Sequence, residues 1–305
     1  MLSAMRSDNP DLLLLDCGGV IPYRDNYREM KSDIIFEAMN KISYDAMNLS
    51  GSDFSLGAPY LEKWSESLSF PLISSNILSV DGTPPPAWIK RYTIVKSGTL
   101  SIGILGIMPE DAFDQILSSE KPSILKIVPP LDAVRSLLPE IIDHVDYIVL
   151  LSQLKVEETT LLSNQLKGID LAISHEKRNS ESVKQNGETV IAPCGTKSSN
   201  IEIIELSTSP EGKLSIVQNK PIVLKEDIPG DPDIDQIITT SYAEKLRETR
   251  MQRYLENFKD RREELMKGLE MSPEEFMKKL NSESNAKQST NVENNTGEEK
   301  AASSN

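Results

Sequence analysis

Histidine and cysteine are scarce in this 305-residue chain, which contains two of each. Cys17 and Cys194 lie far apart in the sequence and form no CxxC pair. A disulfide framework or a structural zinc site needs several closely spaced cysteines or histidines. The sequence therefore predicts neither kind of site, although the two cysteines could still meet in space.

The chain also lacks an excess of basic residues and any long apolar run. Its formal net charge is -14, whereas binding to nucleic acid or to anionic lipid needs clustered lysine and arginine. No segment approaches the roughly 18 apolar residues of a membrane span, and residues 1–11 lack the basic and apolar regions of a signal peptide. We therefore expect no nucleic-acid or membrane partner. For the chain as written, the lack of a signal peptide favours a cytoplasmic location, and export is left open as the alternative. The first predicted core strand begins so close to Met1 that the completeness of the amino-terminus is left open.

The order of apolar segments predicts alternating strands and helices. Four aliphatic residues followed by Asp-Cys-Gly-Gly, at 12–19, indicate a buried parallel strand that ends in a glycine-shaped loop. Apolar residues at helical spacing predict a helix over 26–43. Further strands are expected at 45–49, 70–74, 147–151, 170–173 and 189–192, helices at 58–67, 132–142 and 157–166, and hairpins at 92–105 and 201–217. This order is typical of an α/β sandwich with mixed sheets.

The character of the chain changes after residue 230. An apolar stripe on an otherwise charged segment predicts a long helix over 233–268, which could pack on its own chain, dock on a protein partner or pair with a second copy. A capping box at Ser272-Pro273-Glu274-Glu275 predicts a short helix that ends near residue 280. Beyond it, almost no apolar residue remains, which is typical of a disordered tail. We expect three parts, at 1–230, 231–280 and 281–305.

Several strand-end segments resemble those of the calcineurin-like metallophosphatases, in the 5'-nucleotidase and UDP-sugar hydrolase branch. Tyr-Asp-Ala-Met-Asn-Leu-Ser-Gly-Ser-Asp-Phe, at 44–54, is similar to that family's Tyr-Asp-Ala-Met-Thr-Leu-Gly-Asn-His-Glu-Phe. Shorter similarities lie at 13–20, 70–76, 102–108, 146–154 and 187–195. The resemblance covers most of 12–245. It implies an α/β/β/α sandwich with mixed sheets, and hydrolysis of nucleotides or other phosphoesters at a pair of divalent metal ions.

The resemblance also implies metal ligands at the ends of these segments, and this chain departs from them. Gly19 stands where the family has a bridging aspartate, Gly51 where it has an asparagine, and Ser52 where it has a histidine. Gln153 replaces a further histidine, and only His175 could be matched, by a shifted alignment, to the final metal-binding motif. The family's opening Asp-x-His strand has no counterpart. We therefore expect no metal cofactor and no conventional hydrolysis.

Polar and glycine residues that remain at these loops form a candidate ligand-binding cleft for an unidentified small molecule. Asp16 and Asp53 could hold a single weakly bound cation, or they could accept hydrogen bonds from loop amides. The full expected set is Asp16, Gly18, Gly19, Gly51, Ser52, Asp53, Asn76, Gln153 and His175.

Both cysteines fall in loops that the resemblance places at the same cleft. A helix N-terminus could lower a thiol pKa and make Cys17 or Cys194 a catalytic nucleophile, and the pair could form a redox-active or ligand-capturing site. Both could equally be small buried apolar side chains.

Three functions follow from these observations. The chain could be a non-hydrolytic binding or thiol-based module on a 5'-nucleotidase-like fold, which is the function we favour from the sequence. It could instead be a hydrolase that holds a divalent metal through Asp16, Asp53 and His175. A third possibility is an interaction protein that binds through its long helix.

Overall fold

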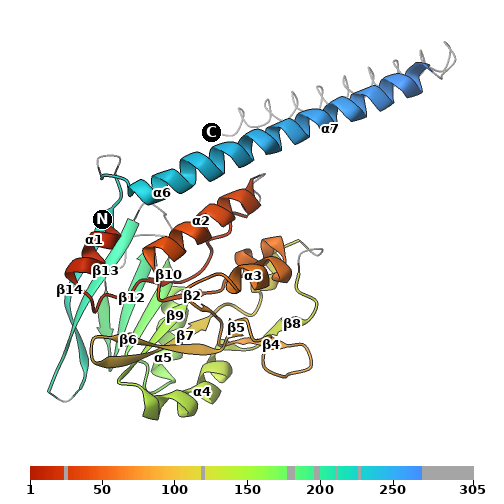
Figure 1. The fold of residues 1–305 in the computed structure, drawn as a ribbon. Coiled ribbons are helices and arrows are strands. Elements are labelled where there is room, and N and C mark those ends of the chain that lie inside the picture. Colours follow the sequence, from red (N-terminus) through yellow and green to blue (C-terminus); the bar gives the residue numbers. More distant parts are fainter. Residues whose placement is uncertain are drawn as a thin grey trace, which may run out of the picture. The chain divides into compact units, whose positions relative to one another are not determined.

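The computed structural model describes residues 1–23, 27–117, 121–176, 183–195, 200–210, 212–225 and 228–269 (Figure 1). The chain divides into two compact units, one of residues 1–242 and one that begins at Ala243. The expected short helix at 272–280 and the expected tail at 281–305 lie outside the described residues. The expected boundary at residue 230 stays a prediction.

The first unit contains most of the secondary structure. Its helices are α1 (Leu2–Asp8), α2 (Arg28–Ile42), α3 (Ala58–Ser65), α4 (Pro130–Ile141), α5 (Val156–Asn164) and α6 (Pro232–Gln236), with 3₁₀ turns η1 (Gly51–Leu56), η2 (Ala112–Gln115) and η3 (Ile142–His144) and a π-helical turn η4 (Ile237–Tyr242). Its strands are β1 (Leu15–Asp16), β2 (Ala46–Asn48), β3 (Leu72–Ile73), β4 (Ile77–Ser79), β5 (Ile89–Lys90), β6 (Tyr92–Ser97), β7 (Leu100–Ile107), β8 (Leu125–Ile127), β9 (Tyr147–Ser152), β10 (Leu171–Glu176), β11 (Lys184–Asn186), β12 (Thr189–Gly195), β13 (Asn200–Thr208) and β14 (Leu214–Val223).

Two sheets lie face to face in the middle of this unit. The smaller sheet is parallel, in the order β1-β2-β3-β5. The larger sheet is mixed, in the order β11-β12-β10-β9-β7-β6, and its four central strands are parallel to one another. Antiparallel strands β11 and β6 close its two edges. Parallel strands end at the same edge of a sheet, and the loops that follow β1, β2, β7 and β9 gather there.

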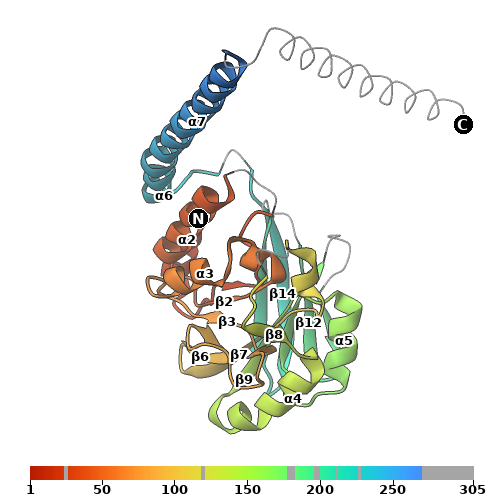
Figure 2. The same cartoon turned by 90° about the vertical axis from the view of Figure 1, so that its right-hand side faces the viewer.

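Three apolar cores separate four layers. One core joins the smaller sheet to α2 and α3, and a second joins the larger sheet to α4 and α5. The third lies between the two sheets, where Ala46 and Ile73 face Ile104, Val149 and their neighbours. Figure 2 shows α2 and α3 on one side of the sheets and α4 on the other. The α/β/β/α sandwich with mixed sheets is therefore confirmed.

The first strand differs from its prediction. Only Leu15 and Asp16 pair with β2, both are half-buried, and β1 lies at the edge of its sheet. Leu13 and Leu15 pack against the core between the sheets, and Leu14, between them in the chain, is also buried, which accounts for the aliphatic run. A continuous apolar run does not distinguish such an edge segment from a central strand.

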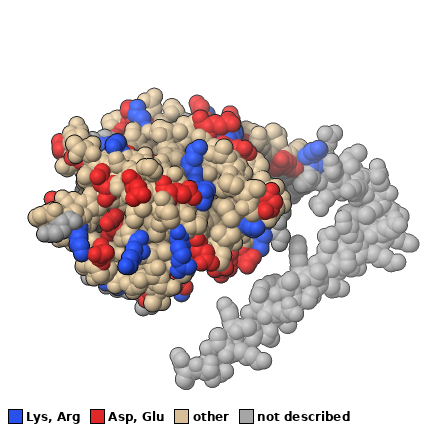
Figure 3. Space-filling view, turned by 90° about the horizontal axis from the view of Figure 1, so that it is seen from below, with Lys and Arg blue, Asp and Glu red and all other residues tan. Residues whose placement is uncertain are grey.

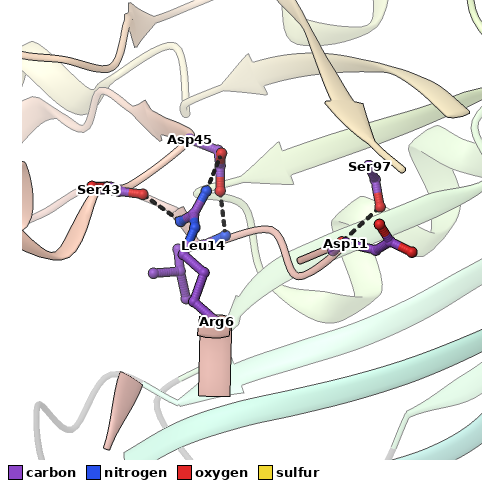
Figure 4. Close-up of polar contacts among 6 residues, drawn as sticks. All are labelled: Arg6, Asp11, Leu14, Ser43, Asp45 and Ser97. Carbon is purple, nitrogen blue, oxygen red and sulfur yellow. Dashed lines mark hydrogen bonds and ion pairs between the residues drawn. The ribbon is translucent and has the colours of Figure 1, made fainter. Parts of the chain in front are cut away.

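Arg6 ties α1 to this edge of the sheet. Its guanidinium donates to the carbonyl oxygen of Ser43, at the end of α2, and lies 2.8 Å from Asp45 (Figure 4). The other oxygen of the Asp45 carboxylate accepts from the amide of Leu14 at 2.7 Å. A second link, from the Ser97 hydroxyl to the carbonyl oxygen of Asp11 at 2.6 Å, fixes the segment before β1 to the β6–β7 turn.

The predicted long helix is helical but not uniform. The π-helical turn η4 separates α6 from α7 (Ala243–Leu269), which forms the described part of the second unit. The hydroxyls of Thr239 and Thr240 both donate to carbonyl oxygens four residues earlier, those of Asp235 and Gln236. Such bonds compete with the helical ladder and favour a local widening of the helix.

Two surface properties complete the fold. No helix in the described ranges combines the length and apolar character needed to cross a bilayer. On the face drawn in Figure 3, acidic and basic side chains are interspersed.

Candidate functional site

The glycine pair after β1 forms the centre of the candidate site. Gly18 and Gly19 both have positive φ, +93° and +91°, a conformation that costs glycine little and other residues more. The amide of Gly18 donates to Asp16 Oδ1 at 2.7 Å, and the amide of Gly19 donates to Asp53 Oδ2 at 2.9 Å. The two aspartates thus hold the turn from either side.

Asp53 lies in η1, after β2, and its carboxylate is fully buried. Besides Gly19, it accepts hydrogen bonds from the amide of Ser50 at 2.9 Å, the hydroxyl of Ser50 at 2.9 Å and the amide of Ile21 at 3.1 Å. The Ser50 hydroxyl in turn lies 2.9 Å from that of Ser52. Four protein donors therefore share the two oxygens of Asp53.

Burial shifts the pKa of both aspartates upward. Loss of hydration raises the pKa of Asp16 to about 6, partly offset by the bond from the Gly18 amide and increased by the nearby charge of Asp53. Burial also raises the pKa of Asp53, against the lowering effect of its hydrogen bonds. Each carboxylate is therefore costly to keep charged in this environment.

Two amide side chains connect the glycine turn to the larger sheet. Gln153, in the loop after β9, donates from Nε2 to the carbonyl oxygen of Cys17, and to that of Gly18 at 3.1 Å. Asn48 is the last residue of β2. Its Nδ2 donates to the carbonyl oxygen of Ile107 at 3.0 Å and to those of Cys17 and Leu151 at 3.3 Å each. The ends of β1, β2, β7 and β9 are thus joined by hydrogen bonds from two side chains.

Asn48 is missing from the residues expected from the sequence. Its signal is a polar amide inside the run Ala46-Met47-Asn48-Leu49, at the end of a buried strand. That signal indicates a buried polar contact but not its partners, which lie about 60 and 100 residues away in the chain.

Gly51 cannot carry a side chain in this structure. A Cβ atom there would overlap the carbonyl oxygen of Ala112 and lie 2.8 Å from its carbonyl carbon. The 3₁₀ turn η2 therefore packs directly on the backbone of η1. The space that an asparagine side chain would need at position 51 is taken by the chain itself.

The structure does not bring every expected residue into this cluster. Asn76 Nδ2 donates to the carbonyl oxygens of Met108 at 2.8 Å and Val128 at 3.0 Å. Asn76 Oδ1 accepts from the backbone amide of Met108 at 3.1 Å. It therefore joins β7 to the segment after β8. His175 lies in β10, in register with Cys194 of β12.

The two cysteines lie at the same end of the larger sheet. The thiol of Cys17 is 3.8 Å from the carbonyl oxygen of Ile173 in β10, and no disulfide joins it to Cys194. Burial raises the pKa of both thiols, that of Cys194 to about 11. This direction is opposite to the lowering that a nucleophilic thiolate would need. Burial therefore does not activate either thiol by lowering its pKa, and a catalytic role of Cys17 or Cys194 stays a prediction.

The donors present at this edge do not fit a pair of divalent cations. Gly19 and Gly51 offer no side chain, Gln153 turns its amide nitrogen to backbone carbonyls, and both oxygens of Asp53 already accept from the loops. Among the residues that the structure describes, no group of three or more His, Cys, Asp or Glu side chains could hold a metal ion. That no metal cofactor is needed stays a prediction.

Comparison with known proteins identifies the class of fold. No family model matches the chain. It is 25% identical to bovine (Bos taurus) 5'-nucleotidase over 183 residues, which cover 55% of this chain and 30% of that protein. The structure of a 5'-nucleotidase precursor from Thermus thermophilus matches with a TM-score of 0.69 at 18% identity, over 81% of this chain and 52% of that one. A calcineurin-like phosphoesterase from Bacillus subtilis matches with a TM-score of 0.64 at 16% identity, over 82% of this chain and 88% of that one.

The fold is that of the calcineurin-like metallophosphatases. The curated relatives and the solved structures that the chain resembles include 5'-nucleotidases. Its matched part spans less than a third of each of the curated relatives that it resembles.

Proposed function

We propose that this chain is a non-hydrolytic, 5'-nucleotidase-like domain whose strand-end loops are held together by its own side chains and not by metal ions. The proposal rests on Asp53, whose two oxygens accept four hydrogen bonds from Gly19, Ile21 and Ser50. A carboxylate whose two oxygens already accept four hydrogen bonds has little capacity left to coordinate a metal ion. The contact of Ala112 with Gly51 supports the same conclusion.

In this proposal, the domain binds a ligand or a partner without converting it. A 5'-nucleotidase-like ancestry makes a nucleotide or another phosphoester the first ligand class to examine. The cytoplasmic location expected from the sequence is also a proposal, since 5'-nucleotidase relatives do not fix the compartment of this chain.

Metal analysis combined with an activity assay tests the proposal. Full-length protein purified without chelator is expected to contain no stoichiometric divalent metal and to leave a generic phosphoester and a panel of 5'-nucleotides unhydrolysed in added Mn²⁺. Its unfolding temperature should be the same with and without a chelator. Stoichiometric bound metal, together with turnover that a chelator abolishes, would instead support the hydrolase that uses Asp16, Asp53 and His175.

Restoring the metal-binding asparagine that the family has at position 51 provides a second test. Gly51→Asn should lower the unfolding temperature, because the new side chain overlaps Ala112, and added Mn²⁺ should not restore it. Ser52→His is the matched control, since Ser52 is partly exposed and its hydroxyl bonds to one neighbouring hydroxyl. A Gly51→Asn variant that is stabilised by Mn²⁺ would show that the loop can still open around a metal.

A second candidate function is self-association through α7, favoured by its exposed apolar side chains. Met251, Tyr254, Leu255 and Phe258 are each more than half exposed, and the rings of Tyr254 and Phe258 stack at 6.2 Å. Their spacing of three and four residues places them on one side of the helix. A stripe of this kind on a charged helix is typical of a helix-pairing surface.

Mass measurement in solution tests this candidate. The full chain is expected to form a dimer that dissociates on dilution, and Leu255→Glu with Phe258→Glu should leave only monomer. Glu256→Gln, which changes the opposite side of α7, is the matched control and should leave the dimer intact. A wild-type monomer at high concentration would eliminate this candidate.

A further inference from the structure

The two cysteines converge on β10 from different elements. Cys17 follows β1, in the smaller sheet, and packs against the core between the two sheets. Its Sγ is 3.8 Å from the carbonyl oxygen of Ile173. The side chain thus reaches across the layer between the sheets and contacts the backbone of the larger one.

Cys194 faces the same layer. Val190 and Ala192, two and four residues earlier in β12, are fully buried in the core between the sheets. Alternate residues of a strand share a face, so Cys194 is directed to the side on which Cys17 lies. Its register partner, His175, is two residues beyond Ile173 in β10. Cys17 therefore contacts β10 at Ile173, and Cys194 lies in the neighbouring strand at the register of His175, on the same side of the sheet.

Electrostatic coupling agrees with this placement. The charge of Cys194 contributes to the raised pKa of Cys17, and the charge of Asp16 contributes to the raised pKa of both thiols.

We propose that Cys17 and Cys194 are a redox pair that closes to an intramolecular disulfide when a small-molecule disulfide is available. In the first step, one thiolate attacks the small disulfide, which releases one small thiol and leaves a mixed disulfide on the protein. The second cysteine, as thiolate, then displaces the other small thiol. Two protein thiols are oxidised, one small disulfide is reduced to two thiols, and two protons leave the cysteines and are taken up by the released thiolates.

The link would tie the glycine turn to the carboxyl end of β12. β1 is short and lies at a sheet edge, so the loop from Asp16 to Gly19 depends on side-chain hydrogen bonds for its position. A covalent link at Cys17 would fix this loop to the larger sheet. The disulfide would therefore act on the same loop that forms the candidate site.

The test uses the full wild-type chain, in which Cys17 and Cys194 are the only thiols. Reduced protein is incubated with oxidised glutathione at pH 7 to 9, quenched with acid, denatured and alkylated. Mass spectrometry is expected to show the loss of two hydrogen atoms and, after digestion, one peptide that joins Cys17 to Cys194. The reaction should be faster at the higher pH, because both thiols have raised pKa values. The oxidised form should unfold several degrees higher than the reduced form, because the link constrains the unfolded chain.

Single-cysteine variants serve as controls. Cys17→Ser and Cys194→Ser should each stop at one glutathione adduct per chain, without the joined peptide and without the rise in unfolding temperature. A wild-type chain that keeps both thiols, that carries only glutathione adducts, or that forms only disulfides between chains would overturn the proposal. These readouts need no ligand and no metal, so their outcome is independent of the proposed function.

Discussion

Asp16 and Asp53 lie on opposite sides of the Gly18–Gly19 turn, and each accepts a hydrogen bond from one of its two amides. The two carboxylates differ in how fully the protein satisfies them. Asp53 has four donors and is completely buried, whereas Asp16 has a bond from Gly18 and is partly exposed. Their substitution should therefore have different consequences.

Replacement of Asp16 by asparagine should change the pH dependence of stability. The pKa of Asp16 is raised from 3.8 to about 6 in the folded chain, so the folded state binds this proton more tightly than the unfolded state. The stability that protonation provides is present below about pH 4 and is lost as the pH rises to about 6. Asp16→Asn keeps an acceptor for the Gly18 amide without the charge. At pH 8 its free energy of unfolding should exceed that of wild type by about 1–2 kcal/mol, so it should unfold at a higher urea concentration.

Urea unfolding at pH 5 and at pH 8 measures this difference. The advantage of Asp16→Asn should be larger at pH 8 than at pH 5. Equal or lower stability of the variant at pH 8 would show that the Asp16 charge is compensated in the folded chain.

Loss of Asp53 should destabilise the first unit strongly. Asp53→Ala removes the acceptor of four donors, and a buried donor without a partner costs about 1–3 kcal/mol. Asp53→Asn should cost less, because its remaining oxygen still accepts from Ser50. Chemical denaturation of both variants at pH 7 tests this order, with Asp143→Asn on the exposed turn η3 as control. A change below about 0.5 kcal/mol in Asp53→Ala, the scale of ordinary surface substitutions, would contradict the assigned role.

Three parallel strands begin with the same arrangement. Directly before each strand, the backbone amide of an aspartate donates a hydrogen bond to the carbonyl oxygen of one residue on the neighbouring segment. The carboxylate of the aspartate accepts a hydrogen bond from the backbone amide of that partner residue. The pairs are Asp45 with Leu14 (2.8 and 2.7 Å), Asp146 with Ser101 (2.8 and 2.7 Å) and Asp170 with Ile148 (3.0 and 2.7 Å). Two bonds to one residue fix the register at which each parallel pair begins.

Asp170→Ala should loosen the start of β10 against β9. The substitution leaves the amide of Ile148 without its carboxylate acceptor at 2.7 Å, so a loss of about 1–2 kcal/mol is expected. In hydrogen exchange, the variant should exchange faster than wild type at the amide of Ile148, and this increase should be larger than at amides in the middle of β9. The exposed Asp143→Ala is the control. Unchanged exchange at Ile148 would show that β9 and β10 keep their register without this carboxylate.

At the scale of the whole molecule, the described chain consists of a layered unit and a helix. The three apolar cores draw all their residues from the first unit. In α7, by contrast, Met251, Tyr254, Leu255 and Phe258 are exposed. The stability of the first unit should therefore not depend on α7.

A chain that ends at Tyr242 tests this independence. It should remain folded, with an unfolding temperature within about 4 °C of the full chain, because a change of 1 kcal/mol shifts a unit of this size by about 2–4 °C. Thermal unfolding followed by circular dichroism measures both chains. A much larger fall, or loss of the cooperative transition, would show that residues beyond 242 contribute to the folded core.

The sequence by itself determined the layers and the order of the longer elements, but it did not predict α1 or the short strands β4, β5, β8 and β11. Strands such as β7 and β9 and helices such as α2 and α4 follow from hydrophobic spacing, which is a local property of the chain. The resemblance of residues 44–54 to a known strand-end loop placed Asp53 and Gly51 at one edge of the sheets. The turn at the glycine pair after β1 was also predicted from the sequence, because two successive residues with positive φ favour glycine.

Only the tertiary structure decided how that edge is closed. Asn48 bonds to Ile107 and Leu151, Gln153 bonds to Cys17, and Ala112 covers Gly51. Each of these contacts joins segments about 60 to 140 residues apart, and no local pattern encodes a contact at that separation. The tertiary structure also decided how far β1 is buried, since burial depends on the neighbouring strands and not on the run of leucines alone. The sequence thus named the loops of the candidate site, and the packing of distant segments determined how those loops are held together.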